Sequence, residues 1–135
     1  MLLCLDVGNS QIFGGLFDGD GVLQVQFRRT SQLRSSSDEL GVFFRTVLRE
    51  NDVDPDLIAD VAICCVVPDL LYSLRACCQK YFSLEPLVLR PGIKTGLKIQ
   101  YRDPREVGAD RIADAVGATI MFPGKNLIVA DFGTA

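Results

Sequence analysis

The chain has 135 residues, of which 48% are hydrophobic and 23% are charged, and its formal net charge is −3. This composition predicts a folded globular protein with a real hydrophobic core and argues against intrinsic disorder. An isoelectric point near 4.8 argues against a nucleic-acid partner or an anionic membrane surface. No stretch stays apolar over the roughly 20 residues that a membrane span requires.

The five cysteines point to a reducing compartment. Four of them form two adjacent pairs, no C-x-x-C spacing occurs, and the chain has no histidine, so the usual zinc spacings are absent. We interpret the cysteines as reduced core thiols of a cytoplasmic protein. The first residues, MLLCLDVGNS, lack the basic leader of a signal peptide, which favours the same location.

The chain opens with three expected strands, at 2–7, 12–17 and 22–27, which the pattern of apolar residues and turn signals predicts to form an antiparallel meander. Ser36 and Glu39 then have the spacing of a capping box, which predicts a helix over roughly 38–51. The remaining expected elements are a buried strand at 61–67, a helix from Pro68, a strand at 87–89, a helix start at 103–106 that continues over 109–121, and a strand at 127–130.

Alternation of strands and helices after a meander predicts a mixed sheet covered by helices. An internal repeat also stands out, because LLCLDVGNS at 2–10 and LIVADFGTA at 127–135 share an apolar strand, an Asp, a Gly and small residues. A glycine turn lets backbone amides approach an anion, and a strand-end Asp suits Mg²⁺ directly or through water. The pair therefore favours two phosphate-binding turns, with an ordinary β-hairpin as the alternative.

A second polar group occurs at the expected start of the helix over 109–121. Gly108, Ala109, Asp110 and Arg111 lie where free amide groups favour anions, and Asp114 follows one turn later. An Asp at this place is suited to accept a proton from a substrate hydroxyl. The alternative is a solvated Asp that only complements the helix dipole.

With these motifs together, the chain resembles the type III pantothenate kinases of the acetate and sugar kinase, heat-shock chaperone and actin superfamily. The resemblance covers the whole chain and depends on D-x-G-N-S at 6–10, K-T-G-L at 94–97, Tyr101, P-R-E-V-G-A-D-R at 104–111 and D-F-G-T at 131–134. It implies a ribonuclease H-like mixed sheet in the order β-β-β-α-β-α-β, flanked by helices. It also implies a first actin-like ATPase domain over 1–117 and the start of a second, truncated one over 118–135.

The resemblance implies that ATP phosphorylates pantothenate to 4′-phosphopantothenate, the first step of coenzyme A biosynthesis, in a homodimer that needs Mg²⁺ and a monovalent cation, K⁺ or NH₄⁺. Asp110 would be the catalytic proton acceptor, Asp131 would hold the monovalent cation, and Asp6 would hold Mg²⁺ through water. The implied ATP-binding residues are Asp6, Val7, Gly8, Asn9, Ser10, Gln11, Ile12, Phe13 and Thr134, and the implied pantothenate-binding residues are Tyr101, Gly108, Ala109, Asp110 and Arg111.

Two other functions remain open on the sequence. A related sugar kinase would share the two Asp-Gly turns, and a regulatory or binding module would keep the fold without turnover. Relatives of this family continue into a second domain, so we expect little or no kinase activity from a polypeptide that ends at residue 135. The basic residues Arg28, Arg29 and Arg34 are outweighed by acidic residues and do not favour nucleic acid.

Overall fold

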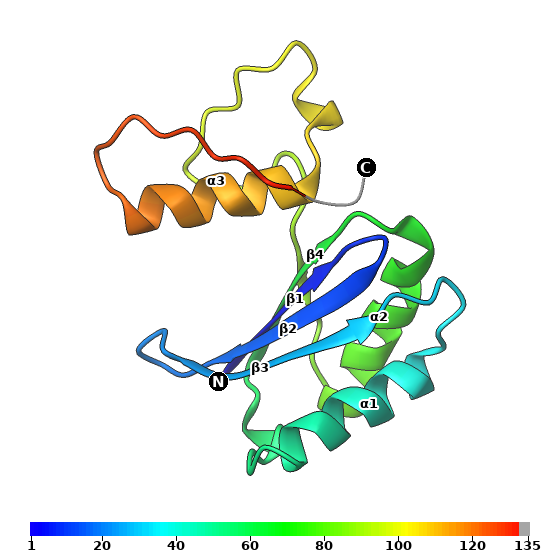
Figure 1. Cartoon of the computed structure of the whole chain (residues 1–135). Coiled ribbons are helices and arrows are strands. Elements are labelled where there is room, and N and C mark those ends of the chain that lie inside the picture. The colour runs from blue at the N-terminus through cyan, green and yellow to red at the C-terminus, as the bar shows by residue number, and fades with distance from the viewer. Residues whose placement is uncertain (133–135) are drawn as a thin grey trace.

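A five-stranded mixed sheet forms the centre of the molecule in a computed structural model (Figure 1). The structure describes residues 1–132, and for residue 105 it describes the backbone but not the side chain. The strand order is β3-β2-β1-β4-β5, with β1, β2 and β3 antiparallel and with β4 and β5 parallel to β1. The predicted meander and the ribonuclease H-like mixed sheet are thereby confirmed. The strands are β1 Leu2–Val7, β2 Gln11–Phe17, β3 Leu23–Thr30, β4 Asp60–Cys65 and β5 Leu87–Val88.

Two helices pack side by side on one face of this sheet, and a third lies on the other side (Figure 1). The first begins at the predicted capping box, in which the Ser36 hydroxyl accepts a hydrogen bond from the Glu39 amide at 3.2 Å and the Glu39 carboxylate accepts one from the Ser36 amide at 2.7 Å. None of the helices within residues 1–132 is long and apolar enough to cross a bilayer. The helices are α1 Ser37–Arg49, α2 Pro68–Phe82 and α3 Ala109–Met121, with short 3₁₀ turns at Pro55–Leu57 and Pro104–Glu106.

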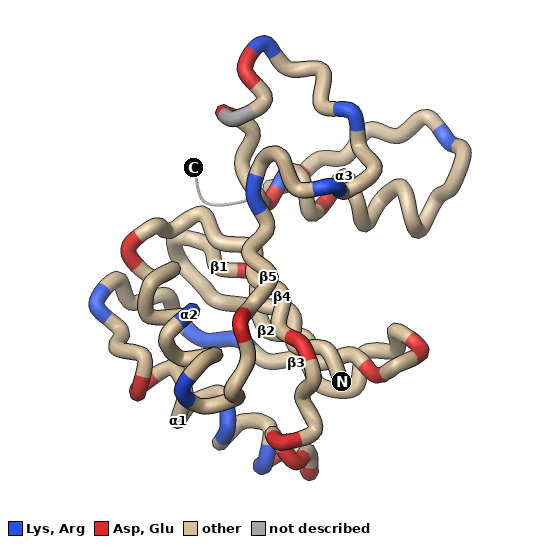
Figure 2. The backbone as a smooth tube through the Cα atoms, turned by 180° about the vertical axis from the view of Figure 1, so that it is seen from behind, with Lys and Arg blue, Asp and Glu red and all other residues tan. Residues whose placement is uncertain are grey.

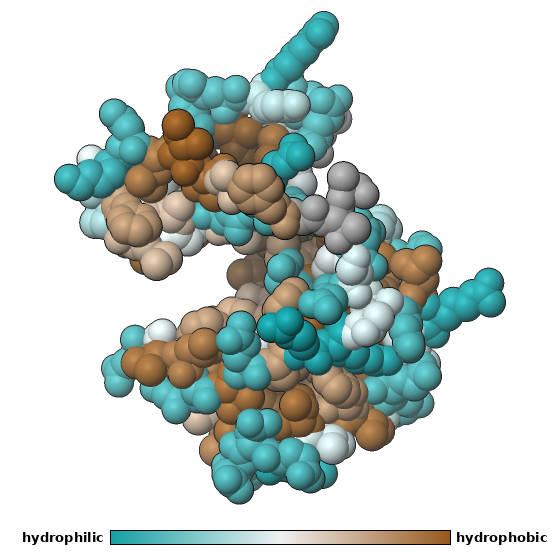
Figure 3. Space-filling view, in the orientation of Figure 1, coloured by the Kyte–Doolittle hydropathy of each residue, from teal (hydrophilic) through white to brown (hydrophobic). Residues whose placement is uncertain are grey.

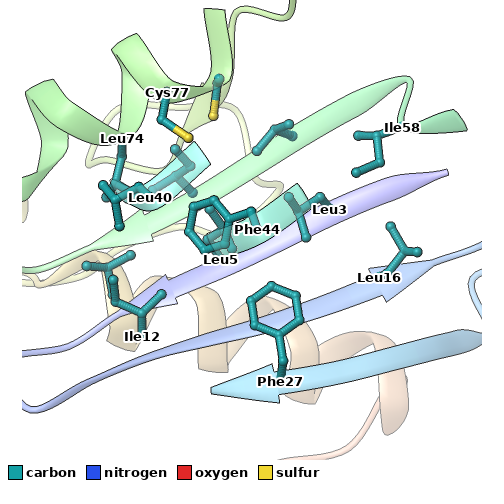
Figure 4. Close-up of a cluster of buried hydrophobic side chains, with 14 of the residues drawn as sticks. Leu3, Leu5, Ile12, Leu16, Phe27, Leu40, Phe44, Ile58, Leu74 and Cys77 are labelled. Atoms are coloured by element: carbon teal, nitrogen blue, oxygen red, sulfur yellow. The ribbon is translucent and has the colours of Figure 1, made fainter. Parts of the chain in front are cut away.

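The hydrophobic core lies between the sheet and the pair α1 and α2 (Figure 4). Because side chains alternate along a strand, every second residue of β1, β2 and β3 points into this core and the residues between them point to the opposite face. The core residues labelled in the close-up are Leu3, Leu5, Ile12, Leu16, Phe27, Leu40, Phe44, Ile58, Leu74 and Cys77.

Two predicted elements differ from the structure. The helix start at 103–106 is a separate 3₁₀ turn, because Gly108 has extended backbone angles (φ −58°, ψ 148°) and α3 begins only after it. The strand predicted at 127–130 does not form, and this prediction was wrong. A strand needs a neighbour for its amide and carbonyl groups, and this segment lies beside α3, away from the five described strands (Figure 1).

Gly14 is a position in β2 where the packing demands glycine. A Cβ there would lie 2.1 Å from the Cζ atom of the Phe27 ring. We therefore expect Gly14→Ala to lower the free energy of unfolding by about 1–3 kcal/mol, measured by urea denaturation. Gly19→Ala is the matched control, because a Cβ at Gly19 meets no atom within 4 Å. Equal urea midpoints for the two variants would show that the ring moves aside without cost.

Candidate functional site

The turn between β1 and β2 is held in place by Ser31, which follows β3. The Ser31 hydroxyl donates to the Gly8 carbonyl at 2.6 Å, and the Ser31 amide donates to the Ser10 carbonyl at 2.9 Å. Within the turn, the Gly8 amide donates to the Gln11 carbonyl at 3.0 Å. Sequence reasoning missed Ser31, although the antiparallel pairing of β2 with β3 places the residue after Thr30 beside this turn.

The turn opens into a cavity of about 510 Å³ that also reaches the start of α3. This cavity therefore joins predicted ATP-binding residues to the predicted catalytic Asp110, which lies about a hundred residues further along the chain. A second cavity of about 650 Å³ adjoins it, and Asp6, Asp110 and Asp131 line both. The first cavity is lined by Asp6, Gly8, Asn9, Ser10, Gln11, Phe13, Val66, Asp110, Asp131 and Phe132.

Figure 3 shows the hollow between the part built around α3 and the part built around the sheet. Its walls are mostly apolar, from the outer face of the sheet and from α3, while the carboxylates gather where the two parts meet. Among the described residues, no Lys or Arg lines either cavity. Lys and Arg positions are instead spread over both parts of the described chain (Figure 2).

A row of four residues runs across the sheet on the face that looks into the hollow. Strand register places Phe13 and Cys64 on the two sides of Asp6, and Arg28 beside Phe13. Interaction with the Cys64 thiol lowers the pKa of the Asp6 carboxylate. Sequence reasoning treated Cys64 only as a core thiol. The parallel pairing of β4 with β1, which the sequence does not reveal, brings it to the site.

Two carboxylates of this site, those of Asp6 and Asp114, have a raised pKa. The pKa of Asp6 is raised, first because the cleft walls remove part of its water and then by the charges of Asp114, Asp110 and Asp131, while the nearby Cys64 thiol opposes the rise. The pKa of Asp114 is raised by the same kind of burial and by the charges of Asp131 and Asp110. A group of like charges without a basic side chain among the lining residues favours the binding of a cation.

Asp110 lies in the first turn of α3, where its carboxylate accepts a hydrogen bond from the Arg111 amide at 2.8 Å. A Cβ at Gly108 would lie 2.3 Å from the same Asp110 oxygen, so this side-chain position requires glycine at 108. The bond agrees with the alternative in which Asp110 only complements the helix dipole. However, its side chain also lines both cavities, which that alternative does not require.

Other predicted site residues lie elsewhere. Val7 and Ile12 are buried in the core at 0% and 1% exposure, so only their backbone is available to a ligand. Tyr101 is 56% exposed and, like Arg111, lines neither of the two cavities. Gly108 and Ala109 line a separate cavity of about 680 Å³ beside β5. The predicted Thr134 lies outside the described residues.

The comparison with known families shows to which family the chain belongs. The family model for type III pantothenate kinase matches residues 2–135. The chain belongs to the type III pantothenate kinase family. This finding confirms the resemblance that the Asp-Gly turns and the G-A-D-R segment indicated.

Three relatives carry the same family name. The chain is 59% identical over all its 135 residues to the type III pantothenate kinase of Legionella pneumophila (strain Corby) and 53% identical to that of Elusimicrobium minutum (strain Pei191). It is 44% identical to type III pantothenate kinase 1 of Francisella tularensis subsp. holarctica (strain OSU18). In each case the match covers 52% of the relative, so the chain spans about half the length of the curated relatives it matches.

The donor atoms of the candidate site suit a hard cation. No group of three or more His, Cys, Asp or Glu side chains within residues 1–132 is arranged to hold a metal ion by itself. Mg²⁺ is commonly held by one or two carboxylates, with phosphate oxygens and waters completing its six ligands. Asp6 and its neighbouring carboxylates fit that mode of binding.

Asp114 provides a test of the charge repulsion in this candidate site. Its carboxyl pKa is raised in the folded state, so the charged form costs stability at neutral pH, and this cost disappears below the ordinary pKa of 3.8. We expect Asp114→Asn to raise the melting temperature at pH 7, with a gain that shrinks toward pH 3.8. Thermal denaturation without Mg²⁺ measures this, with Asp69→Asn in the first turn of α2 as the control. A gain of the same size at both pH values would contradict the repulsion.

Proposed function

We propose that this chain provides the phosphate-binding half of an ATP-dependent pantothenate kinase, which forms 4′-phosphopantothenate in the first step of coenzyme A biosynthesis. The observation that carries the proposal is the cavity in which the β1–β2 turn and Asp110 meet. Phosphoryl transfer needs a phosphate cradle and a proton acceptor within one space, and this cavity contains both kinds of group. Membership of the family supplies the identity of the acceptor substrate.

In this proposal, the turn amides from Gly8 to Gln11 hold the phosphate chain, and the Ser31 hydrogen bonds keep the turn rigid. Asp110 accepts the proton of the pantothenate hydroxyl as that oxygen attacks the terminal phosphorus of ATP, and the bond from this phosphorus to the bridging oxygen breaks to release ADP. Asp6 holds Mg²⁺ through water, and Asp131 holds K⁺ or NH₄⁺. Such cations neutralise the negative charge of the phosphates. The described residues that line the two cavities include no Lys or Arg that could do so.

The remaining assignments are proposals on the same basis. Thr134 contacts ATP, the Arg111 guanidinium pairs with the pantothenate carboxylate, and Tyr101, Gly108 and Ala109 complete that pocket. Because Tyr101 and Arg111 line neither of the two cavities, these contacts require further closure of the segment around α3. The whole protein works in the cytoplasm as a homodimer, with a first actin-like domain over 1–117 and a second from 118. That boundary falls inside the continuous helix α3.

A chimeric enzyme tests the proposal. Residues 1–135 replace the matching half of the Legionella pneumophila relative, and ADP release is measured with pantothenate, with hexoses and without acceptor. We expect ADP release that depends on pantothenate and Mg²⁺ and that increases with K⁺ or NH₄⁺. Turnover with a hexose alone would favour the sugar kinase alternative. A folded chimera without turnover, beside an active parent enzyme, would favour a non-catalytic module.

A further inference from the structure

Arg28 lies in the row of residues that crosses the sheet beside the phosphate-binding turn. Strand register pairs Asp6 with Phe13, and Phe13 with Arg28. Phe13 lines the cavity beside the turn, and Gln26, two residues before Arg28 on the same strand, lines the hollow on the same face. Alternation along β3 therefore directs the Arg28 side chain to the side of the sheet on which Asp6 lies.

The Arg28 guanidinium is held above Phe13, with its Cζ atom 5.1 Å from the ring centroid. A cation over an aromatic ring is attracted by the ring and loses freedom of movement. No carboxylate within residues 1–132 forms an ion pair with Arg28, and its side chain is exposed. Its five N–H donors thus remain available for a ligand.

The neighbouring Arg29 shows what a structural arginine looks like in the same strand. Its side chain turns to the opposite face of the sheet, where it donates to the Ser35 hydroxyl at 3.1 Å and lies over the Phe43 ring at 5.4 Å. These contacts fix Arg29 against α1. For Arg28, by contrast, the ring of Phe13 is the one partner found among the described residues, and no hydrogen bond or ion pair there fixes its guanidinium.

We propose that Arg28 binds the phosphate chain of the nucleotide held by the β1–β2 turn, with Phe13 as the platform that orients its guanidinium. The inference depends on the proposed function, since it adds a residue to the same site. Three carboxylates and no Lys or Arg line the cavity within the described part of the chain, so a cation at its edge complements the phosphate oxygens that the turn amides leave unpaired. The planar guanidinium suits this contact because it donates two parallel hydrogen bonds to phosphate.

Isothermal titration of the chimeric enzyme, in which residues 1–135 replace the matching half of the Legionella pneumophila relative, with Mg·ATP, Mg·tripolyphosphate and adenosine tests the proposal. A charge-assisted contact to phosphate corresponds to about a tenfold to hundredfold change in affinity. We expect Arg28→Gln to weaken binding of Mg·ATP and Mg·tripolyphosphate by this factor and to leave adenosine binding unchanged. Arg28→Lys should lose less affinity for the phosphate ligands, because lysine keeps the positive charge but lacks the two parallel N–H donors of the guanidinium. Arg34→Gln, an exposed arginine in the loop after β3, is the matched control and should bind like the wild type.

A double-mutant cycle tests the platform. Phe13→Leu should weaken phosphate binding less than Arg28→Gln, and the double variant should be no weaker than Arg28→Gln alone, since both act through one guanidinium. If the wild type binds tripolyphosphate and Arg28→Gln binds it equally well, the proposed role of Arg28 is wrong. The proposed nucleotide site would not be affected by that result. An equal loss of adenosine binding would also overturn it, because that pattern reports a general distortion. Failure of the wild type to bind either phosphate ligand would overturn both proposals.

Discussion

Asp110→Asn is expected to lower kcat of the chimera by about a hundredfold or more, because general base catalysis by a positioned side chain contributes about 10²–10⁴-fold. Asparagine has the same shape, and its carbonyl oxygen still accepts the hydrogen bond from the Arg111 amide, so α3 should begin as before. What is lost is the ability to take the proton of the acceptor hydroxyl. Steady-state ADP release with saturating pantothenate and ATP measures the effect.

The matched control for Asp110 is Asp69→Asn. Asp69 is also a first-turn Asp of a helix, but it is exposed at the start of α2 and lines neither cavity of the site. It should therefore leave kcat unchanged. A catalytic role for Asp110 predicts a fall in kcat with little change in the KM for ATP. If Asp110→Asn kept most of the rate, the carboxylate would only complement the helix dipole, as the alternative interpretation holds.

Phe44→Ala is expected to cost about 3–5 kcal/mol of unfolding free energy, the range for removing a buried aromatic ring. Phe44 is 0% exposed and packs against Phe27 and Phe43, with ring centroids 5.9 Å and 5.7 Å away. The loss should be large because this cluster joins α1 to the sheet, so the remaining side chains cannot fill the cavity without moving the helix. Urea denaturation followed by circular dichroism measures the change.

Phe132→Ala serves as the control for Phe44→Ala. Phe132 is 96% exposed, so its removal should change the free energy of unfolding by no more than about 0.5 kcal/mol. Similar urea midpoints for the two variants would mean that the core between α1 and the sheet contributes little to stability. That result would also weaken the assignment of the core to this face of the sheet.

Local patterns predicted local structure well. The Ser36 and Glu39 capping box, the first three strands and the helices at α1 and α2 depend on residues a few positions apart, and all of them are confirmed. The strand predicted at 127–130 was wrong although its composition is typical of a strand. Its formation depends on a partner strand, and composition carries no information about whether one lies beside it.

The candidate site likewise has features that the sequence predicted and features that only the structure shows. Two Asp-Gly turns and the G-A-D-R segment were visible in the sequence, because a tight turn and a helix start require particular residues at fixed spacing. The residues that lie near Asp6 on neighbouring strands could not be predicted from the sequence. Cys64 reaches it through the parallel pairing of β4 with β1, and Arg28 approaches it through two successive antiparallel pairings.

By itself, then, the sequence determined most of the helices and strands, the turn after β1 and the family of this protein, because these depend on short-range geometry and on residue identity. Only the tertiary structure decided which side of the sheet each residue faces and which distant residues share a cavity. The reason is that strand register sets both, and a shift of one residue would turn Asp6, Phe13 and Arg28 from the hollow into the core.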